Sequence, residues 1–572
     1  MADFLLEVRF WSIFLILNYL NYVVIYLFHY KESGFLPYLT TFKRTGKTGL
    51  TGDPNLDFFR YSVEFSLILI GSRFFDLHTY AGWITVFYFF ALFFNLYQYS
   101  FRKIYESEPI LFNDVRLIKN GVAIVWNESK WKILFGLFLL IILFFGFSKG
   151  LSFLLLENYR LNTSIFFKIL ITAFILINLY AIYIHKGVYV KYPNDIYLRF
   201  HYTLVEFFMN LEKSYECYQL SQESFGKRFQ EARENINIEL SENPPNIHFI
   251  FIESYGSFFY QSEKLKDIAY PTLGSFQENI AQKGYQTLSN MSESTTTGGQ
   301  SWLTYSSMLF GYRMDNNTLF ENLLNDPHFR NGQGLMQIFK KIGYTNYNLN
   351  PISPINGITV PYDAMRAFYG IDRWILNKDI HYTGDKYGFG TAAPDQYSMN
   401  FTRELIEKEK IIPYTFFYLT KSSHSPFPKV KLVDDWKKLN HTTGSTHEHQ
   451  GFLKYPTVED YGQAIKYQLE NLEQFISHHK YANDLFVLMG DHQPPVVSKP
   501  KTHGLTTPVH IISKNNAFLD EFKDFGFKKD LSSASKHIKH ESFYSIFLNA
   551  FSKHYAKSSA SIPDYEPDGL QL

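Results

Sequence analysis

The sequence predicts an α-helical membrane domain of about five transmembrane helices, followed by an α/β domain. Charged residues make up only 19% of the chain and hydrophobic residues 46%, whereas soluble domains usually contain about 25% charged residues. Apolar runs of nearly membrane-spanning length all lie in the first third of the chain. After Pro244-Pro245, short apolar runs alternate with amphipathic stretches, which is the pattern of an α/β domain.

The membrane part is predicted from the length of its apolar runs, because a helix needs about 20 mostly apolar residues to cross a bilayer. One of the five runs is interrupted by Glu64 and Arg73, and a buried soluble helix is the alternative for it. The first run lacks the basic N-terminal residues and the small-residue cleavage site of a signal peptide, so we expect it to remain in the protein as a membrane anchor. The runs are Phe10–Phe28, Tyr61–Phe75, Ala81–Tyr97, Ile133–Phe147 and Ile165–Ile184.

Five spans place the two ends of the chain on opposite sides of the membrane. Two basic loops between the spans then lie on the same side of the membrane as the C-terminal domain. The positive-inside rule alone would make that domain cytoplasmic. Both loops also contain acidic residues, so this indication is modest. The basic residues are Lys43, Arg44, Lys47, Arg102, Lys103, Arg116 and Lys119.

We expect a transmembrane domain over residues 1–186, a helical juxtamembrane connector over 187–243, a catalytic α/β domain over 244–552 and a tail over 553–572. The expected strands are Ile247–Ile252, Tyr414–Leu419, Leu485–Met489 and Val509–Ile512. The expected helices are Thr272–Lys283, Gly334–Ile342 and Asp460–His478.

Charge and cysteine content exclude several classes of function. The chain has 55 Lys and Arg against 54 Asp and Glu, which gives no electrostatic reason to expect nucleic acid as a partner. Its only cysteine is Cys217, so an intrachain disulfide and a cysteine-based zinc site are both excluded.

Two of the expected strands end in residues that can bind a metal. Glu253 follows the strand Ile247–Ile252, and Asp491-His492 follows Leu485–Met489 and Gly490. Ligands in α/β sheets gather at the carboxyl ends of strands, so we expect these groups to converge. An oxygen-rich set with one imidazole suits manganese, magnesium or zinc. The alternative is that Glu253 caps a helix and Asp491-His492 is a polar loop.

A hydroxyl-rich turn, Ser294 to Gln300, leads into an apolar helix that begins near Ser301. A hydroxyl at a helix N-terminus lies beside backbone donors and a partial positive charge, which favour an alkoxide and a bound phosphate. Simple N-capping by Ser or Thr is the alternative.

Two histidines in loops complete the candidate site. His424 lies in Lys421-Ser-Ser-His-Ser-Pro-Phe, and His503 follows His492 by eleven residues. Each could donate to a phosphate oxygen or protonate a leaving group, although a lone loop histidine is more often solvated. We expect a surface role for His441, His447 and His449.

Taken in this order, the motifs resemble the alkaline phosphatase superfamily, and within it the membrane-bound sulfatase-like branch. That branch contains lipoteichoic acid synthases, phosphoglycerol transferases and phosphoethanolamine transferases. The resemblance spans nearly the whole chain and implies an alkaline-phosphatase/sulfatase-like catalytic domain. It also implies a multi-pass protein of the cytoplasmic (inner) membrane with an extracytoplasmic catalytic domain, and this outweighs the count of basic residues.

The resemblance also implies roles for individual residues. Glu253, Asp491 and His492 match the metal ligands, with the nucleophilic hydroxyl as a fourth, around one divalent ion: manganese first, magnesium or zinc as alternatives. Ser301 stands ten residues before Gly311 of Met308-Leu-Phe-Gly, where sulfatases place the nucleophile, and Thr297 is the alternative. His424 and His503 match histidines that contact the substrate phosphate.

The implied activity is transfer of a phosphoglycerol or phosphoethanolamine head group. The donor is a membrane phospholipid, the acceptor is an extracytoplasmic glycan or lipid, and the intermediate is a phospho-serine. The alternatives are a membrane-tethered hydrolase (a phosphodiesterase or a sulfuric ester hydrolase) and a non-catalytic sensor. The absence of cysteine at position 301 argues against a formylglycine sulfatase.

One departure from the family concerns the substrate. Lipoteichoic acid synthases carry a Trp-Asn-Arg-Asp segment, and the corresponding stretch here is Val360-Pro-Tyr-Asp363. A polyglycerolphosphate product is therefore not expected, and Arg366 or Arg373 are the candidates for the missing cation.

Overall fold

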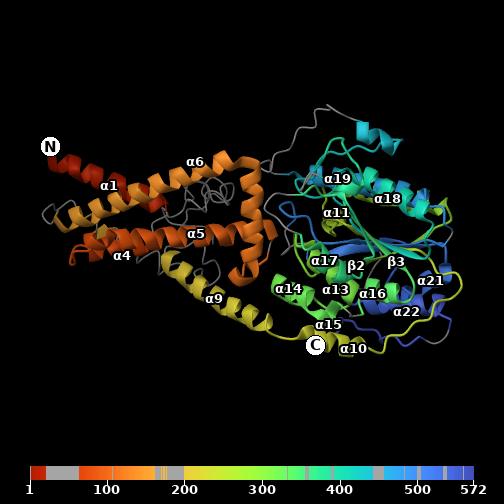
Figure 1. Cartoon of the computed structure of the whole chain (residues 1–572). Coiled ribbons are helices and arrows are strands. Elements are labelled where there is room, and N and C mark those ends of the chain that lie inside the picture. The colour runs from red at the N-terminus through yellow and green to blue at the C-terminus, as the bar shows by residue number, and fades with distance from the viewer. Residues whose placement is uncertain are drawn as a thin grey trace. The chain divides into compact units, whose positions relative to one another are not determined.

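The computed structural model describes residues 2–20, 63–160 except 106, and most of 199–572 (Figure 1). Within the last range, it leaves out 331–332, 355–359, 388–391, 442–455, 482, 499–503, 532–536 and 558–559. Residues 169, 172–173 and 176 are described as helical. The chain divides into two compact units. The first comprises Met1–Lys103, Glu108–Leu111 and Gly121–Tyr215, and the second comprises Ile104–Ser107, Phe112–Asn120 and Glu216–Leu572.

The described part of the first unit is built from helices. They are α1 (Ala2–Leu20), α4 (Val63–Gly71), η2 (His78–Tyr80), α5 (Ala81–Tyr105), α6 (Leu111–Arg160) and the start of α9 (Arg199–Leu220). Polar bonds hold pairs of them together: Asn158 of α6 donates to Ser72 Oγ at 2.8 Å, and Asn95 of α5 donates to Thr203 of α9 at 3.1 Å. Aromatic side chains such as Phe14 and Phe65 fill the space between α1 and α4.

Two stretches of this unit are long and apolar enough to cross a membrane, His78–Arg102 and Ile133–Asn158. They contain two of the five runs predicted to span, Ala81–Tyr97 and Ile133–Phe147. Large apolar side chains of α6 are exposed, as expected for a surface that lipid covers: Trp131 at 74%, Phe135 at 62% and Phe145 at 60%.

The other three predicted spans stay predictions. Only the first part of Phe10–Phe28 is described, as the end of α1, a helix that also carries Asp3, Glu7 and Arg9. In the region of Tyr61–Phe75, α4 is nine residues long. The run Ile165–Ile184 lies almost wholly outside the described residues.

The second unit contains an eight-stranded mixed sheet with the strand order β4-β3-β5-β1-β6-β7-β2-β8. Strand β7 runs antiparallel to β6 and β2, whereas the other neighbouring pairs are parallel. The strands are β1 (Ile247–Ile252), β2 (Gln286–Glu293), β3 (Thr345–Asn350), β4 (Arg373–Leu376), β5 (Tyr414–Leu419), β6 (Leu485–Gly490), β7 (Thr506–Ser513) and β8 (Ile538–Lys539).

Helices cover both faces of this sheet (Figure 1). One core contains Phe249 and Phe251 of β1 together with side chains of α13 (Ser301–Phe310), α14 (Asn317–Asn325), α16 (Leu335–Lys341) and α22 (Phe543–Tyr555). The opposite core contains Ile250 and Ile252 of β1 together with side chains of α11 (Phe258–Gln261), α12 (Lys266–Ala281), α18 (Asp395–Glu409) and α19 (Val458–Ser477). Because successive side chains of a strand point to opposite faces, one apolar strand serves both cores.

The remaining helices of the second unit are short. They are α10 (Phe225–Arg233), α15 (Pro327–Arg330), α17 (Tyr362–Tyr369), α21 (Asn516–Asp520), η4 (Asn377–Asp379), η5 (Trp436–His441) and η6 (Lys523–Phe525). The stretch expected to be a connector thus contains α9 and α10, in agreement with its helical spacing.

The C-terminal residues, which we expected to form a tail, pack on the second unit. Helix α22 continues to Tyr555, and the Leu570 N–H donates to the Gly311 carbonyl at 2.7 Å. Glu566 forms a two-point ion pair with the buried Arg233. Such an arginine–carboxylate pair fixes the orientation of both groups, so these residues belong to the folded unit.

Buried histidines of this sheet make its stability depend on pH. Burial lowers the pKa of His510 in β7 to about 4, whereas an unfolded histidine titrates near about 6.5. As pH falls from about 6.5 to 4, the unfolded chain gains a proton that the folded chain does not bind. The folded state therefore loses stability in that window, by about 2 kcal/mol at pH 5 for this group.

We predict that His510→Gln loses less thermal stability than wild type between pH 7.5 and pH 5, measured by tryptophan fluorescence of the full chain in detergent. The exposed His537 supplies the matched control, His537→Gln, which should follow wild type. An equal loss in wild type and His510→Gln would contradict the prediction.

Candidate active site

The site begins with two carboxylates at the ends of neighbouring parallel strands. Strands β1 and β6 pair in a register that sets Ile252 opposite Gly490, so Glu253 and Asp491 follow at the same edge of the sheet. Both are buried, with 3% and 0% of their surface exposed. The Ser254 N–H donates to Asp491 Oδ1 at 2.7 Å, which holds the second carboxylate against the end of β1.

His492 presents one ring nitrogen to these carboxylates. Its Nδ1 lies 2.8 Å from the Gln493 carbonyl, a contact that requires the proton on Nδ1 and leaves the Nε2 lone pair facing the site. Nε2 lies 3.3 Å from Asp491 Oδ2 and 3.6 Å from Glu253 Oε1, and the Gly299 N–H donates to it at 2.9 Å.

Ser301 joins the group from the N-terminus of α13. Its Oγ lies 3.4 Å from Glu253 Oε2 and 3.3 Å from His492 Nε2. The chain reaches this position through Gly299 (φ 74°) and Gln300 (φ 58°), a left-handed turn in which a residue without a β-carbon costs least. As the first residue of a ten-residue helix, Ser301 lies at the positive end of the helix dipole.

The turn between β2 and α13 is tied to the end of β6. The Ser294 hydroxyl donates to the Asp491 carbonyl at 2.6 Å. Thr297, the alternative nucleophile, directs its hydroxyl elsewhere, donating to the carbonyl of Tyr105. The structure therefore brings Ser301, rather than Thr297, into contact with Glu253 and His492.

The two carboxylates are electrostatically coupled. Burial, with Glu253 as the next cause, raises the pKa of Asp491 to about 7. Burial also tends to raise the pKa of Glu253, but His424, His492 and Lys421 outweigh it and lower that pKa. Two buried carboxylates this close repel each other when both are charged, so the site favours a cation.

A divalent cation fits this group of donors. One donor atom each from Glu253, Asp491 and His492 lies within 4.8 Å of the others, and Ser301 Oγ is adjacent. Asp491 Oδ2 is buried without a hydrogen-bond partner, which is costly for a carboxylate unless a cation binds it. Carboxylate, hydroxyl and imidazole donors suit manganese, magnesium or zinc.

A loop after β5 places two further groups near the carboxylates. His424 and Lys421 both act electrostatically on Glu253. Burial lowers the pKa of Lys421, while Glu253, Asp395 and Asp491 oppose this effect. A buried ammonium held among three carboxylates in this way is typical of functional sites.

Asp395, at the start of α18, holds this loop in place. Its carboxylate accepts hydrogen bonds from the Tyr418 hydroxyl and from the backbone N–H groups of Lys421 and Ser422, the latter at 2.7 Å. Neither Lys421 nor Asp395 was predicted from the sequence. Lys421 stands three residues before His424 and could have been found from that proximity, but nothing local marks Asp395.

A third residue that the sequence did not predict, His540, joins two strand ends beside the site. Its Nε2 lies 3.1 Å from the Gly490 carbonyl and its Nδ1 lies 2.9 Å from Ser292 Oγ. Burial lowers its pKa to about 4, so the ring is neutral and bonds to both strand ends. It fixes the spacing between the end of β6, which carries Asp491, and the end of β2, which leads to Ser301.

Several candidates are not placed at the site. His503, His447 and His449 lie outside the described residues, and for His441 only the backbone, at the end of η5, is described. Arg373 pairs with Glu409, and Arg366 donates to the Asp372 carbonyl at 2.6 Å. Both arginines are therefore engaged away from the carboxylates.

Comparison with known proteins finds similarity among solved structures. No protein-family model matches this chain, and no curated protein matches it. A protein in the alkaline phosphatase superfamily from Vibrio parahaemolyticus is 17% identical, with 56% of this chain and 70% of that chain covered and a TM-score of 0.35. Streptococcus pyogenes phosphoglycerol transferase GacH, in complex with sn-glycerol-1-phosphate, is 13% identical, with 59% and 81% covered and a TM-score of 0.35.

A third similar structure is the C-terminal periplasmic domain of EptC from Escherichia coli in complex with zinc. It is 13% identical, with 58% of this chain and 87% of that chain covered and a TM-score of 0.37. These structures belong to the superfamily that the sequence resembles. At such identities and TM-scores the similarity carries no argument about activity.

We predict that Glu253→Gln weakens Mn²⁺ binding at this centre by about tenfold or more, because it removes one of the two carboxylate ligands and leaves Asp491 as the only negatively charged one. Calorimetric titration of the full chain in detergent measures the change. Glu278→Gln, at an exposed position of α12, is the control and should bind as wild type does. Equal affinity in Glu253→Gln and wild type would show that the cation is bound elsewhere.

Proposed function

We propose that this chain is a metal-dependent membrane transferase. It would move a phosphoglycerol or phosphoethanolamine head group from a phospholipid to an extracytoplasmic glycan or lipid acceptor, through a phospho-serine on Ser301. The observation that carries the proposal is the position of Ser301 Oγ, at a helix N-terminus and 3.3–3.4 Å from His492 and Glu253. A hydroxyl beside buried carboxylates and an imidazole is the arrangement of an activated nucleophile.

Glu253, Asp491, His492 and Ser301 would hold the divalent ion, with manganese as the first candidate and magnesium or zinc as alternatives. When bound, such an ion lowers the pKa of a coordinated hydroxyl and offsets charge on a phosphoryl group. The Gln493 carbonyl keeps the imidazole of His492 in the tautomer that presents Nε2. The Ser254 N–H keeps Asp491 in position.

In the first step, Ser301 Oγ forms a bond to phosphorus while the bond from phosphorus to the diacylglycerol oxygen breaks. The hydroxyl proton of Ser301 leaves to solvent, and the diacylglycerol oxygen takes a proton. His424 is the candidate donor, because it lies near Glu253 in the loop that Asp395 holds. In the second step, the acceptor oxygen forms a bond to phosphorus while the bond from phosphorus to Ser301 Oγ breaks. The acceptor's proton passes to His424, and Ser301 Oγ takes a proton from solvent.

Positive charge near the carboxylates supports binding of a phosphodiester. Lys421 and His424 lie on the loop after β5, and Ser301 lies at the N-terminus of α13, where the helix dipole favours a bound anion. These groups stabilise charge on the equatorial oxygens of the transition state. His503 stays a proposed phosphate contact on the strength of the sequence resemblance.

A lipid donor would explain why a catalytic domain of this kind is attached to membrane helices. Two stretches long and apolar enough to cross a membrane and the exposed apolar face of α6 support a membrane-bound chain. We extend the proposal to a multi-pass protein of the cytoplasmic (inner) membrane with its catalytic domain outside. Tethering the site there limits the search for a lipid to two dimensions.

We predict that Ser301→Ala lowers the release of diacylglycerol by about a hundredfold or more, because it removes the nucleophile. The full chain in liposomes of phosphatidylglycerol and phosphatidylethanolamine, with Mn²⁺ present, supplies the assay. Thr297→Ala is the matched control and should stay within a few-fold of wild type, since its hydroxyl bonds to the Tyr105 carbonyl.

A large loss of diacylglycerol release in Thr297→Ala, with little change in Ser301→Ala, would make Thr297 the nucleophile and contradict the assignment. Analysis of the head group distinguishes the alternative activity. Free glycerol phosphate or phosphoethanolamine, formed equally fast without any added glycan or lipid acceptor, would identify a hydrolase that uses water at the same site.

A further inference from the structure

The opposite edge of the same sheet contains a second buried group of metal-binding side chains. His248 is the second residue of β1, Asp484 directly precedes β6, and His479 follows α19 by two residues. We propose that His248, His479 and Asp484 form a structural zinc site at the amino-terminal edge of the sheet. This proposal does not depend on the proposed transferase activity.

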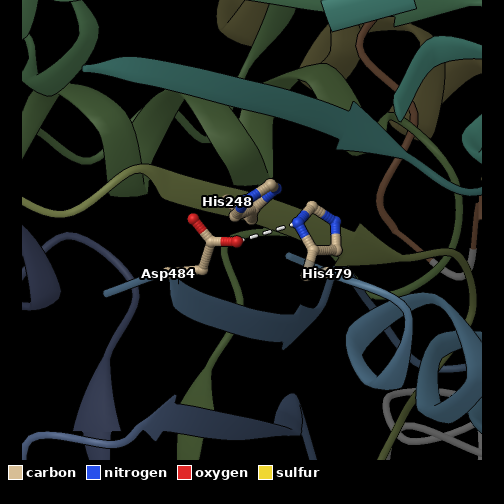
Figure 2. Close-up of side chains that lie close together, drawn as sticks. All are labelled: His248, His479 and Asp484. Atoms are coloured by element: carbon tan, nitrogen blue, oxygen red, sulfur yellow. Dashed lines mark hydrogen bonds and ion pairs between the residues drawn. The ribbon is translucent and has the colours of Figure 1, made fainter. Parts of the chain in front are cut away.

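The three side chains lie close together, with a nitrogen of His479 facing the carboxylate of Asp484 (Figure 2). A ring nitrogen of each histidine and a carboxylate oxygen of Asp484 all lie within 4.8 Å of one another. His479 Nδ1 and Asp484 Oδ2 are 2.9 Å apart, and the two imidazole rings are 4.5 Å apart at 78°. Ligands of a tetrahedral zinc lie about 3.3 Å from each other, so small side-chain rotations suffice to complete the site.

The group is buried and has unused ligand atoms. His248 and Asp484 are 1% and 0% exposed, and the side chain of His479 is 1% exposed. His248 Nδ1 and His479 Nε2 have no hydrogen-bond partner among the described residues. Buried polar atoms are nearly always satisfied, so the unpaired Nδ1 of His248, whose ring packs against the His479 ring of the His479–Asp484 pair, points to an ion.

The histidines are in the protonation state that binds metal. Burial lowers the pKa of His248 far below the ordinary value, and burial together with Arg403 lowers the pKa of His479 to about 3. Both rings are therefore neutral at pH 7 and carry a lone pair. Two neutral imidazoles and one carboxylate are a ligand set that zinc accepts.

Neighbouring groups orient the carboxylate of Asp484, and the two cations that act on the group have contacts of their own. The Asn246 side chain donates to Asp484 Oδ1 at 2.8 Å, which turns Oδ2 toward His479 in the manner of an outer-shell partner. Arg403, the cation with the largest electrostatic effect on His479, is paired with Glu407 at 3.9 Å. Lys514 also acts on Asp484, and its ammonium lies over the ring of Tyr285.

The position of the group indicates a structural role. A bound ion would join the end of α19 to β1 and β6, the two strands whose other ends carry Glu253 and Asp491. Glu253 follows His248 by five positions along the chain, a distance of about 17 Å in an extended strand. The two centres are therefore distinct, and the second would brace the strand pair that carries the first.

The test is zinc stoichiometry of the full chain in detergent, measured by elemental mass spectrometry after chelation, reloading with Zn²⁺ and dialysis. We expect two equivalents in wild type and one in each of His479→Gln and Asp484→Asn. His478→Gln is the matched control, because His478 is the exposed neighbour of His479, and it should keep two. Glu253→Gln should keep one and Glu253→Gln/His479→Gln none.

A second measurement covers the case in which His479→Gln or Asp484→Asn fails to fold. In Glu253→Gln, where the second group is intact, Co²⁺ should give the absorption of a tetrahedral nitrogen-oxygen site. No such absorption would overturn the proposal, as would an equal zinc content in wild type, His479→Gln and Asp484→Asn. Either result would leave a hydrogen-bonded His–Asp pair without metal.

Discussion

The parallel pairing of β1 with β6 is the constraint on which the site depends. Its register sets the ends of the two strands side by side, so Glu253 and Asp491 emerge together in a buried environment. Burial raises the pKa of Asp491, repulsion from Glu253 adds to the rise, and together they bring it to about 7. The fold must then provide compensating charge, and His492, Lys421, His424 and a divalent cation are the groups that can supply it.

The surrounding contacts keep this unfavourable arrangement in place. The end of β6 is joined to the hydroxyl turn through Ser294 and to the end of β2 through His540. Both contacts are made to backbone carbonyls of Gly490 and Asp491, so they fix the strand end without using the carboxylate. The turn can therefore present Ser301 to the carboxylates at a fixed distance.

The apolar strands were predictable because their hydrophobicity is local. The predicted runs Ile247–Ile252 and Tyr414–Leu419 coincide with β1 and β5. Strand β3 was missed because its sequence, Thr345-Asn-Tyr-Asn-Leu-Asn350, is polar. Asn346 satisfies its buried amide by donating to the carbonyls of Met336 and Gly370, a tertiary arrangement that hydrophobicity does not reveal.

The candidate site was predictable where its residues follow apolar strands, as Glu253 and Asp491-His492 do. The choice between Ser301 and Thr297 could not be made from hydroxyl chemistry, because both lie in the same turn. It depends on the backbone at Gly299 and Gln300, which bends Ser301 inward while Thr297 bonds to the Tyr105 carbonyl. Asp395 was unpredictable because it acts through the fold, holding the loop of His424 from a different helix.

The central claim is that Ser301 becomes covalently modified by a phospholipid head group. Peptide mass spectrometry tests it most directly, with the full chain incubated with Mn²⁺ and mixed bacterial phospholipids and stopped rapidly by acid. We expect a phosphoglycerol or phosphoethanolamine adduct on the peptide that contains Ser301, assigned to that residue by fragmentation and absent from Ser301→Ala. An adduct located on Thr297 that persists in Ser301→Ala would contradict the account.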